Sequence, residues 1–561
     1  MQKNCKKCNL SFEITTEDLE FYKKISPKFW DKIFEIPTPT LCPECRQQRR
    51  LAWRNERKLY KRKCDATGEV MISIYSPDKQ YKVYSNDFYW SDKWDALDYG
   101  KNFDFNKSFF KQFGELLKEA PLVNIHSHLS NINSQYTNYF ISSKNCYFCF
   151  WWWYCEDVFY SSFPLHCNDS MELFFSFNCE NCYNITHSNN CNRLYNSTNC
   201  IDCYNGYFLE NCVNCKNCIA CNWLINKDYC FLNKQLTKQE FNDILEKFKN
   251  NTLDKNILKK IKNFNKTNIK LSNILRWSTN SNWWYIISSN NVNNSFNIID
   301  WDNIKHSNIL MNNVKDVYDS FGSWVDIELI YETVTASMWI NKVLFSSIIR
   351  DSCSNIFYSF NISNSSNLFW CVWLKNKEYC IFNKQYTKEE YNKLVPKIIE
   401  KIIKDWEWWE FFPANLSPFW YNETVANEYF PLTKEKAQKL GFNWSDYKPP
   451  FPKVEKVIPA EKLPEDISKI PDDILNWAIK CEVSWKPFRI IKQELEFYRK
   501  HKLSIPKKHP DIRHSERMKL RNPRKLFDRK CDKCWVEIKS TYALDREEIV
   551  YCKGCYEDEV Y

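Results

Sequence analysis

Cysteines recur at a fixed spacing through an asparagine-rich stretch in the middle of the chain. Cys179, Cys200 and Cys221 lie 21 residues apart, as do Cys146 and Cys167. Short β-type segments alternate there with Asn, Ser and Cys turns. A constant period of short strands predicts a parallel β-solenoid, here with coils of about 21 residues. Like residues stack in such a fold, so we expect asparagine ladders and buried cysteine columns, with Cys179, Cys200 and Cys221 in one column.

The solenoid region is duplicated. The block 221–230 recurs as 371–380, and both blocks continue into Asn-Lys-Gln-x-Thr-Lys-x-Glu. Thr237 and Thr387 are predicted helix N-caps, each with a glutamate three residues later that completes a capping box. The sequence therefore predicts two solenoids, each followed by a helix that caps its open end.

Paired cysteines with metal-ligand spacing lie at both ends of the chain. The spacing is C-x2-C-x33-C-x2-C near the N-terminus and C-x2-C-x17-C-x2-C near the C-terminus. Four thiolates in tetrahedral geometry leave no open coordination position, so the predicted zinc ions are structural. We predict two zinc ions, one bound by Cys5, Cys8, Cys42 and Cys45 and one by Cys531, Cys534, Cys552 and Cys555.

The two ends are also copies of one module. Leu19–Tyr22 aligns with Leu495–Tyr498 at an offset of 476, and after an insertion near residues 26–34 the offset becomes 467. The alignment indicates two zinc subsites per module, of which the first copy keeps the first and the second copy keeps the second. Buried relics are expected at the lost subsites, which carry Cys64, Thr67, Ser85 and Phe88 in the first copy and Cys481, Ser484, His509 and Ile512 in the second.

The first module resembles the treble-clef zinc-ribbon family over about fifty residues. The resemblance rests on Cys5-x-x-Cys8, Phe12, the stretch 20–22, and Cys42-x-x-Cys45 leading into a basic helix. The whole chain is similar to large uncharacterised cysteine-rich proteins of candidate-phylum bacteria, some of which carry a CaiB/BaiF CoA-transferase label. The chain has no βαβ order and no glycine-rich nucleotide loop to match that label. The resemblance thus implies a zinc ribbon and brings no activity.

Arginines cluster beside both zinc motifs at equivalent positions. Guanidinium groups bind phosphates well, so a basic helix beside a zinc ribbon predicts a nucleic-acid surface. Substituting these arginines is then expected to weaken binding without unfolding the module. Two alternatives stay open: ion pairs with acids such as Glu44 or Glu56, and a protein partner. The candidate nucleic-acid-binding residues are Arg46, Arg50, Arg54, Arg57, Arg513, Arg517, Arg521 and Arg524.

An alternative function is a β-solenoid enzyme that acts on a polymer, which would need two carboxylates converging on one face. Neither candidate set is expected to recur in the other solenoid, and no nucleophile–base arrangement is recognisable, so we expect a non-enzymatic scaffold. The run 212–221 has a spacing that an iron–sulfur cluster or zinc could use, but its register favours buried stacking columns. The candidate carboxylates are Asp157, Asp169 and Glu172 in the first solenoid and Asp316, Asp319, Asp326 and Glu328 in the second.

Glycine is scarce and tryptophan abundant. The chain has 7 glycines and 24 tryptophans, whereas ordinary usage of ~7% would give roughly 39 glycines. Trp535 follows a C-x-x-C pair where a zinc knuckle favours positive φ, and it aligns with Gly68 of the first module. We therefore expect that many tryptophan codons are UGA and that the native residue is glycine.

The predicted fold class is multidomain α+β, with terminal zinc-ribbon (treble-clef) modules flanking a duplicated parallel β-solenoid with capping helices. The chain begins without an apolar signal segment, and no run approaches the ~18 apolar residues of a membrane span. We expect a cytoplasmic protein. The predicted domains are a first module at 1–89, a connector at 90–140, solenoids with helices at 141–262 and 263–404, a connector at 405–478, and a second module at 479–561.

Overall fold

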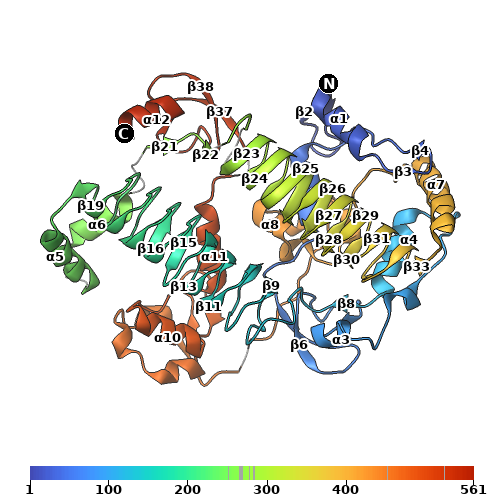
Figure 1. The fold of residues 1–561 in the computed structure, drawn as a ribbon. Coiled ribbons are helices and arrows are strands. Elements are labelled where there is room, and N and C mark those ends of the chain that lie inside the picture. Colours follow the sequence, from blue (N-terminus) through green and yellow to red (C-terminus); the bar gives the residue numbers. More distant parts are fainter. Residues whose placement is uncertain are drawn as a thin grey trace. The chain divides into compact units, whose positions relative to one another are not determined.

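The computed structural model describes all residues except 251, 265–268, 274, 277, 282–284, 452, 524 and 561 (Figure 1). The chain divides into two compact units. Unit 1 comprises residues 1–125, 273–447 and 539–541, and unit 2 comprises 126–272, 448–538 and 542–561. The first module therefore shares a unit with the second solenoid, and most of the second module shares a unit with the first solenoid.

The first solenoid is a 12-stranded sheet in unit 2 whose strands pair in parallel, apart from a closing antiparallel hairpin. Its strands are β9 (Asn138–Ile141), β10 (Phe150–Trp153), β11 (Glu156–Phe159), β12 (Ser162–Leu165), β13 (Asn168–Met171), β14 (Phe174–Phe177), β15 (Tyr183–Thr186), β16 (Asn192–Thr198), β17 (Tyr204–Tyr207), β18 (Lys216–Ile219), β19 (Asp228–Phe231) and β20 (Lys234–Gln235).

The coil of the first solenoid contains 12 residues, so the predicted period of 21 is wrong. Tyr183 pairs with Tyr195, which pairs with Tyr207. The buried core residues are spaced by multiples of three. Because 12 and 21 are both multiples of three, a spacing of 21 keeps a cysteine inside the coil but moves it to another column. Cys179, Cys200 and Cys221 accordingly lie in different columns.

Every third residue of this solenoid has a left-handed backbone, for example Asn184 with a φ of 53° and Asn196 with a φ of 50°. These residues form the corners between the short strands. Asparagine tolerates this conformation better than most residues, which explains the asparagine-rich composition. The side chains also form the predicted ladders, since Asn184 Nδ2 donates to Asn196 Oδ1 at 2.8 Å and Asn214 Nδ2 to Asn226 Oδ1 at 2.6 Å.

Buried cysteines fill the narrow interior of the first solenoid, as predicted. Their thiols donate to backbone carbonyls, for example Cys182 Sγ to the Glu180 carbonyl at 3.2 Å. Burial raises the pKa of the Cys146 thiol well above its ordinary value, so this thiol stays protonated. The longest uninterrupted column contains Cys155, Cys167, Cys179, Cys191, Cys203 and Cys215, each 12 residues from the next.

The second solenoid is also a 12-stranded sheet and lies in unit 1. Its coils contain 11 residues at the start, then 12, then 13 in the middle, where Val314 pairs with Ile327 and Ile327 with Ile340, and 12 again at the end. Its strands are β22 (Leu275–Arg276), β23 (Ile286–Asn293), β24 (Phe296–Lys305), β25 (Asn308–Trp324), β26 (Ile327–Ala336), β27 (Ile340–Leu344), β28 (Ser347–Arg350), β29 (Cys353–Phe357), β30 (Phe360–Ser363), β31 (Ser366–Phe369), β32 (Glu378–Ile381) and β33 (Lys384–Gln385).

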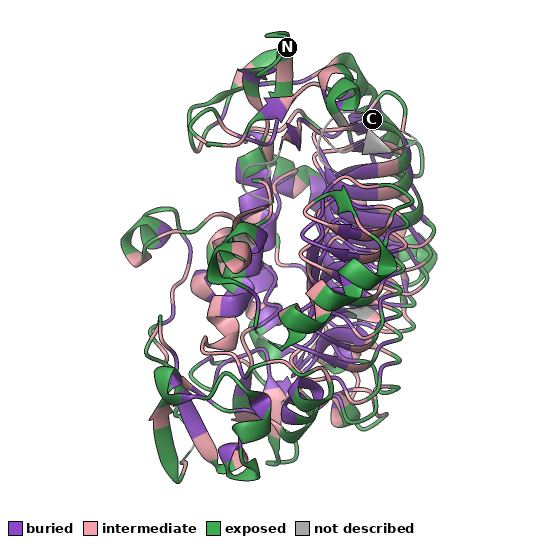
Figure 2. Cartoon of the chain, turned by 90° about the vertical axis from the view of Figure 1, so that its left-hand side faces the viewer, coloured by how far each residue is buried: buried purple, intermediate pink, exposed green. Residues whose placement is uncertain are grey.

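Helices follow both solenoids, as predicted. Thr237 and Thr387 are the N-caps of α5 (Lys238–Lys249) and α7 (Lys388–Lys404), and both capping boxes form. A further helix, α6 (Lys255–Asn263), follows α5. Figure 2 shows that the stacked strands are buried along much of their length, whereas the helices carry exposed faces. Among the described residues, no helix has the length and apolar character that crossing a membrane requires.

The two modules contain the same elements at the offsets found in the sequence. The first contains β1 (Gln2–Asn4), β2 (Ser11–Glu13), α1 (Thr16–Ile25), β3 (Lys28–Phe29), β4 (Lys32–Ile33), α2 (Pro43–Leu51), β5 (Tyr60–Lys63), β6 (Val70–Ser73), β7 (Val83–Tyr84) and α3 (Asn86–Tyr89). The second contains β35 (Trp477–Lys480), β36 (Pro487–Phe488), α10 (Lys492–Lys500), α11 (Pro510–Lys519), β37 (Phe527–Lys530), β38 (Glu537–Ser540), β39 (Val550–Tyr551) and α12 (Lys553–Val560). Only the first has the β3–β4 hairpin, which is the insertion near residues 26–34.

The segments that connect these parts contain short elements. Between the first module and the first solenoid lie η1 (Ala96–Tyr99), α4 (Phe109–Glu119) and β8 (Leu122–Val123), and β21 (Lys270–Leu271) precedes the second solenoid. The segment after α7 contains η3 (Ala414–Leu416), η4 (Tyr421–Glu423), α8 (Val425–Tyr429), α9 (Lys434–Lys439), β34 (Lys456–Pro459), η5 (Ala460–Lys462), η6 (Ile467–Lys469) and η7 (Asp472–Asn476).

Candidate metal centres

The N-terminal cysteine cluster is built from a tight turn and the start of a helix. Cys5 and Cys8 lie on the turn between β1 and β2, where the Cys5 amide donates to Leu10 and the Asn9 amide donates to Cys5, both at 2.9 Å. Asn9 has positive φ, which the turn requires. Cys42 is the N-cap residue of α2, and Cys45 lies in its first turn. The helix N-terminus favours negative charge and therefore thiolates.

The four sulfur atoms of this cluster are close enough to share one metal ion, since they all lie within 4.8 Å of one another. The Cys8 and Cys42 sulfurs are 3.7 Å apart. A hydrogen bond from the Cys45 side chain lowers the pKa of the Cys42 thiol to about 5. A thiolate is thus available at neutral pH, as metal ligation requires.

The C-terminal cluster repeats this geometry with more exposed ligands. The Cys531 amide donates to Val536 and the Trp535 amide donates to Cys531, both at 2.9 Å. Cys552 immediately precedes α12, and its sulfur lies 3.7 Å from that of Cys534. The four sulfurs again lie within 4.8 Å of one another. Burial raises the pKa of Cys531, but backbone amides outweigh this effect and lower it to about 6.

The two clusters differ in accessibility. Only Cys8 is exposed in the N-terminal cluster, whereas Cys534 is exposed and Cys552 and Cys555 are half-buried in the C-terminal one. Among the described residues, these two clusters are the groups of side chains that could hold a metal ion. The cysteine run 212–221 is buried in the solenoid core instead.

The lost subsites keep the turn without the ligands. The Ser85 amide donates to Cys64 Sγ at 3.2 Å, as the Cys552 amide does to Cys531 Sγ at 3.2 Å. Cys481 likewise sits in a turn closed by the Trp485 amide. Cys64 and Cys481 are 2% and 0% exposed, so the prediction that both are buried is confirmed.

The arginines of α2 face the second solenoid. Arg46 donates to Asp319 at 2.7 Å, and Arg50 donates to Glu332 at 3.0 Å and lies 3.2 Å from Asp319. Arg49 pairs with Glu332 at 3.1 Å. Arg46 and Arg50 are 2% and 1% exposed, and Asp319 and Glu332 are buried with them. These groups form a buried ion network that docks the first module on its solenoid.

The second module docks on the first solenoid in the same way. Arg513 and Arg517 of α11 both donate to Glu172, and Arg513 lies 3.6 Å from Glu494. All four side chains are buried. Burial raises the pKa of Glu172, but the two arginines outweigh it and lower the pKa below its usual value. Glu494 accepts hydrogen bonds from the Tyr160 and Tyr498 hydroxyls, both at 2.8 Å.

The placement of the predicted arginines on an exposed helix face therefore needs correction. Arg54 is buried and pairs with Glu56 at 2.7 Å, as the ion-pair alternative predicted, and Arg57 is also buried. Arg521 is half-buried, with its guanidinium 5.4 Å from the Phe174 ring centre. Arg524 lies outside the described residues. The basic face turns inward because the solenoid presents buried carboxylates to it.

The docking carboxylates occupy equivalent positions in the two solenoids, so the expectation that neither set recurs is also wrong. Lys24 of α1 pairs with Asp316 at 2.7 Å, and the equivalent Lys500 of α10 pairs with Asp169. The strand pairing identifies the equivalent corner position on each following coil. Starting from Glu172 these positions are 184, 196, 208, 220 and 232. Starting from Asp319 they are 332, 345, 358, 370 and 382. Both acids thus lie five coils before the capping hairpin.

Two further candidate carboxylates, Asp326 and Glu328, bind asparagines of neighbouring coils. Asp326 accepts a hydrogen bond from Asn313 at 2.6 Å, and Glu328 accepts one from Asn341 at 3.4 Å. These are ladder contacts between coils. Sequence reasoning missed Glu332 and Glu494 as partners of the arginines; the shared offset of Lys24 and Lys500 was the available signal for docking at this corner.

In comparisons with known proteins, no protein-family model, curated protein or solved structure matches the chain. The two four-cysteine clusters fit zinc-ribbon-like modules.

Proposed function

We propose that the chain is a non-enzymatic scaffold that binds two structural zinc ions. Four cysteine sulfurs at tetrahedral spacing favour zinc or iron and leave no position for a substrate. The observation that carries the proposal is the position of Cys45 directly before Arg46 on α2. One residue of this helix faces the metal, and the next binds Asp319 of the solenoid. Zinc would thus order the helix that docks the module.

Metal analysis of single variants tests this proposal. We expect about two zinc ions per chain, and the loss of one in each of Cys45→Ser and Cys534→Ser. Cys64→Ser and Cys481→Ser are matched controls, since these cysteines occupy the same turn at the lost subsites and should release no zinc. Iron in place of zinc, or no metal in protein purified under reducing conditions, would contradict the proposal.

We further propose nucleic acid as the partner of the modules, contacted through lysines instead of the docking arginines. Lys63 and Lys530 are equivalent by offset and both exposed at the ends of β5 and β37. Phosphate contacts of this kind position a protein without specifying sequence.

A binding titration at two salt concentrations tests this partner. The slope of log K against log salt should be about −0.9 per phosphate neutralised on duplex DNA and about −0.7 on single strands. Lys63→Glu with Lys530→Glu should weaken binding to all sequences alike, whereas Lys234→Glu on the solenoid hairpin should not. No binding at low salt would leave a protein partner as the better proposal.

We also propose that many tryptophans are natively glycine. Ten of the tryptophans that the structure describes have positive φ, a conformation that costs residues with a Cβ roughly 1–2 kcal/mol: Trp30, Trp151, Trp223, Trp339, Trp370, Trp373, Trp406, Trp409, Trp485 and Trp535. Trp485 and Trp535 occupy the turn position held by Asn9 and Gly68 in the first module. The source gene should have UGA at codons 223, 373, 485 and 535, and peptides of the native protein should contain glycine there. UGG at all four codons would contradict the proposal that these residues are natively glycine.

A further inference from the structure

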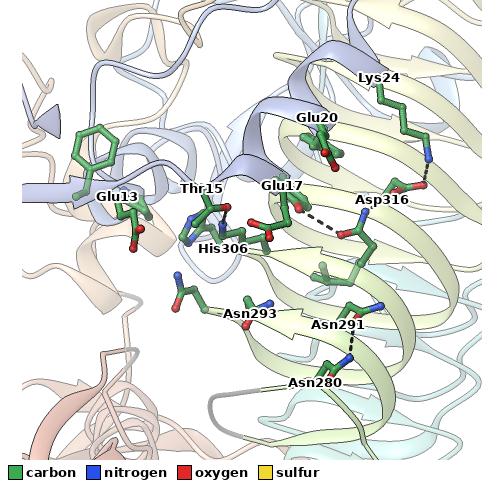
Figure 3. Close-up of a pocket in the computed structure, with 18 residues that line it drawn as sticks. Glu13, Thr15, Glu17, Glu20, Lys24, Asn280, Asn291, Asn293, His306 and Asp316 are labelled. Carbon is green, nitrogen blue, oxygen red and sulfur yellow. Dashed lines mark hydrogen bonds and ion pairs between the residues drawn. The ribbon is translucent and has the colours of Figure 1, made fainter. Parts of the chain in front are cut away.

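A cleft of about 770 Å³ lies in unit 1 between the first module and the second solenoid (Figure 3). One wall is formed by β2 and α1, and the other by the corner residues of β23 to β25. The volume falls within the ~300–1,000 Å³ of small-ligand sites. The cleft is separate from the cysteine cluster and is not explained by the zinc proposal.

The solenoid wall is a ladder of asparagines on successive coils. Asn280 Nδ2 donates to Asn291 Oδ1 at 3.3 Å, and Asn291 Nδ2 donates to Asp302 at 3.0 Å. Asn303 follows one coil later and donates to Asp316. A carboxamide has two N–H donors and a carbonyl with two lone pairs, so each rung keeps hydrogen-bonding capacity beyond the ladder. Successive rungs are about 4.8 Å apart.

The module wall supplies acceptors. Glu13, Glu17 and Glu20 line the cleft (Figure 3). The two lysines of the lining are engaged by aspartates: Lys24 pairs with Asp316 at 2.7 Å, and Lys305 with Asp18 at 2.6 Å. A hydrogen bond from Thr15 lowers the pKa of Glu17, which is therefore ionised and accepts hydrogen bonds at neutral pH. This wall disfavours phosphates and other anions.

Two of the residues that line the cleft form a buried aromatic pair. The Tyr318 ring stacks on Phe21 with 3.8 Å between ring centres. Burial, together with Arg46 and Lys305, holds the pKa of His306 well below its ordinary value, so its imidazole is neutral and offers one donor and one acceptor. Rows of acceptors and carboxamides match a neutral ligand with many hydroxyl groups.

The second module lacks this lining. The positions equivalent to Glu13, Thr15 and Glu17 are Arg489, Ile491 and Gln493, and Arg489 donates instead to the Leu475 carbonyl at 2.7 Å. The docking contacts nevertheless recur in unit 2. Docking thus does not require carboxylates at the positions of Glu13 and Glu17, which supports a ligand-binding role for these two side chains.

We propose that the cleft between α1 and the asparagine ladder of the second solenoid binds a short neutral oligosaccharide. The asparagine amides donate to its hydroxyl oxygens, and Glu17 and Glu20 accept from its hydroxyl groups.

Calorimetric titration of the full-length, zinc-loaded protein tests this site. Cellotriose, maltotriose and chitotriose are the probes, with spermidine as a cationic comparison. At least one trisaccharide should bind, and Glu17→Gln combined with Asn291→Ala should weaken it at least tenfold. Glu496→Gln, at the position in unit 2 equivalent to Glu20, is the matched control and should leave the affinity unchanged.

Three outcomes would overturn the proposal: no trisaccharide binds, binding does not respond to the cleft variant, or spermidine alone binds. Zinc content and the thermal transition of each variant are measured in parallel. A change in zinc content would indicate a folding defect, and the single variant Glu20→Gln, on the exposed face of α1, then provides the test. The zinc proposal is independent of this result.

Discussion

Each unit docks a module on a solenoid through arginine–carboxylate contacts, but the four-cysteine clusters lie in different places relative to the docking helix. In unit 1 the metal cluster includes the first turn of α2, the helix whose arginines bind the solenoid. In unit 2 the equivalent helix α11 starts at His509 with no cluster, and the cysteines lie further along at α12. The arginine–carboxylate contacts are nevertheless retained in both. The docking contacts are thus common to both units, whereas the four-cysteine cluster includes the docking helix in unit 1 and lies outside it in unit 2.

Removing zinc should have the largest effect and should separate the two units. Structural zinc supplies folding free energy, about 10–16 kcal/mol of apparent binding in small zinc modules. Cys45→Ser should release the metal and expose the amides of α2 to hydrogen exchange. Cys534→Ser should release its metal while α11 stays protected. Equal loss of protection in α2 and α11 would show that docking needs both ions.

Removing the acceptor in unit 2 should come next. Glu172→Ala leaves Arg513 and Arg517 buried without their shared carboxylate, and breaking a buried pair costs about 3–5 kcal/mol. Asp319→Ala in unit 1 should cost less, because Glu332 still accepts from Arg50. Urea denaturation of both variants measures the difference. Asp326→Ala, on an exposed ladder, is the control, and an effect as large as that of Glu172→Ala would argue against the docking network.

Acid should weaken docking in unit 2. The folded-state pKa of Glu172 is lowered, so its contribution to stability is present above the unfolded value near 4.3 and is lost as pH falls through the folded value. Glu494, whose pKa is raised by burial, contributes with the opposite sign and loses stability as pH rises. Melting temperatures of wild type and Glu172→Gln should therefore converge as pH falls from about 4.3 through the lower folded value. Parallel curves down to pH 2 would be inconsistent with this assignment.

The smallest predicted effect concerns the turns themselves. Trp535→Gly should stabilise the second module by about 1 kcal/mol, because glycine adopts φ near 63° without a Cβ clash. Trp420→Gly, at a residue with φ of −77°, is the control and should give no gain. Thermal unfolding measures both. A destabilised Trp535→Gly would show that the indole is the native side chain there.

Local patterns were readable from the sequence because their partners are close along the chain. The capping boxes at Thr237 and Thr387 join residues three apart, and the positive φ of Trp535 follows from its place after a C-x-x-C pair. The sequence showed that the cysteines point inward in columns, but it did not reveal the 12-residue coil. Inward positions recur every three residues, so a spacing of 21 residues is also compatible with burial.

By itself, the sequence determined the two four-cysteine clusters, the duplicated modules, the solenoids and their capping helices, since each depends on short spacings that one segment contains. Tertiary structure alone decided what the arginines do and which module joins which solenoid. Arg46 meets Asp319 across 273 positions and Arg513 meets Glu172 across 341. A guanidinium beside a zinc motif suits phosphate and carboxylate equally well. The carboxylates come within reach of the guanidinium groups only when the coils stack. Once the buried ion pairs have formed, breaking one would leave an uncompensated buried charge, which is strongly unfavourable.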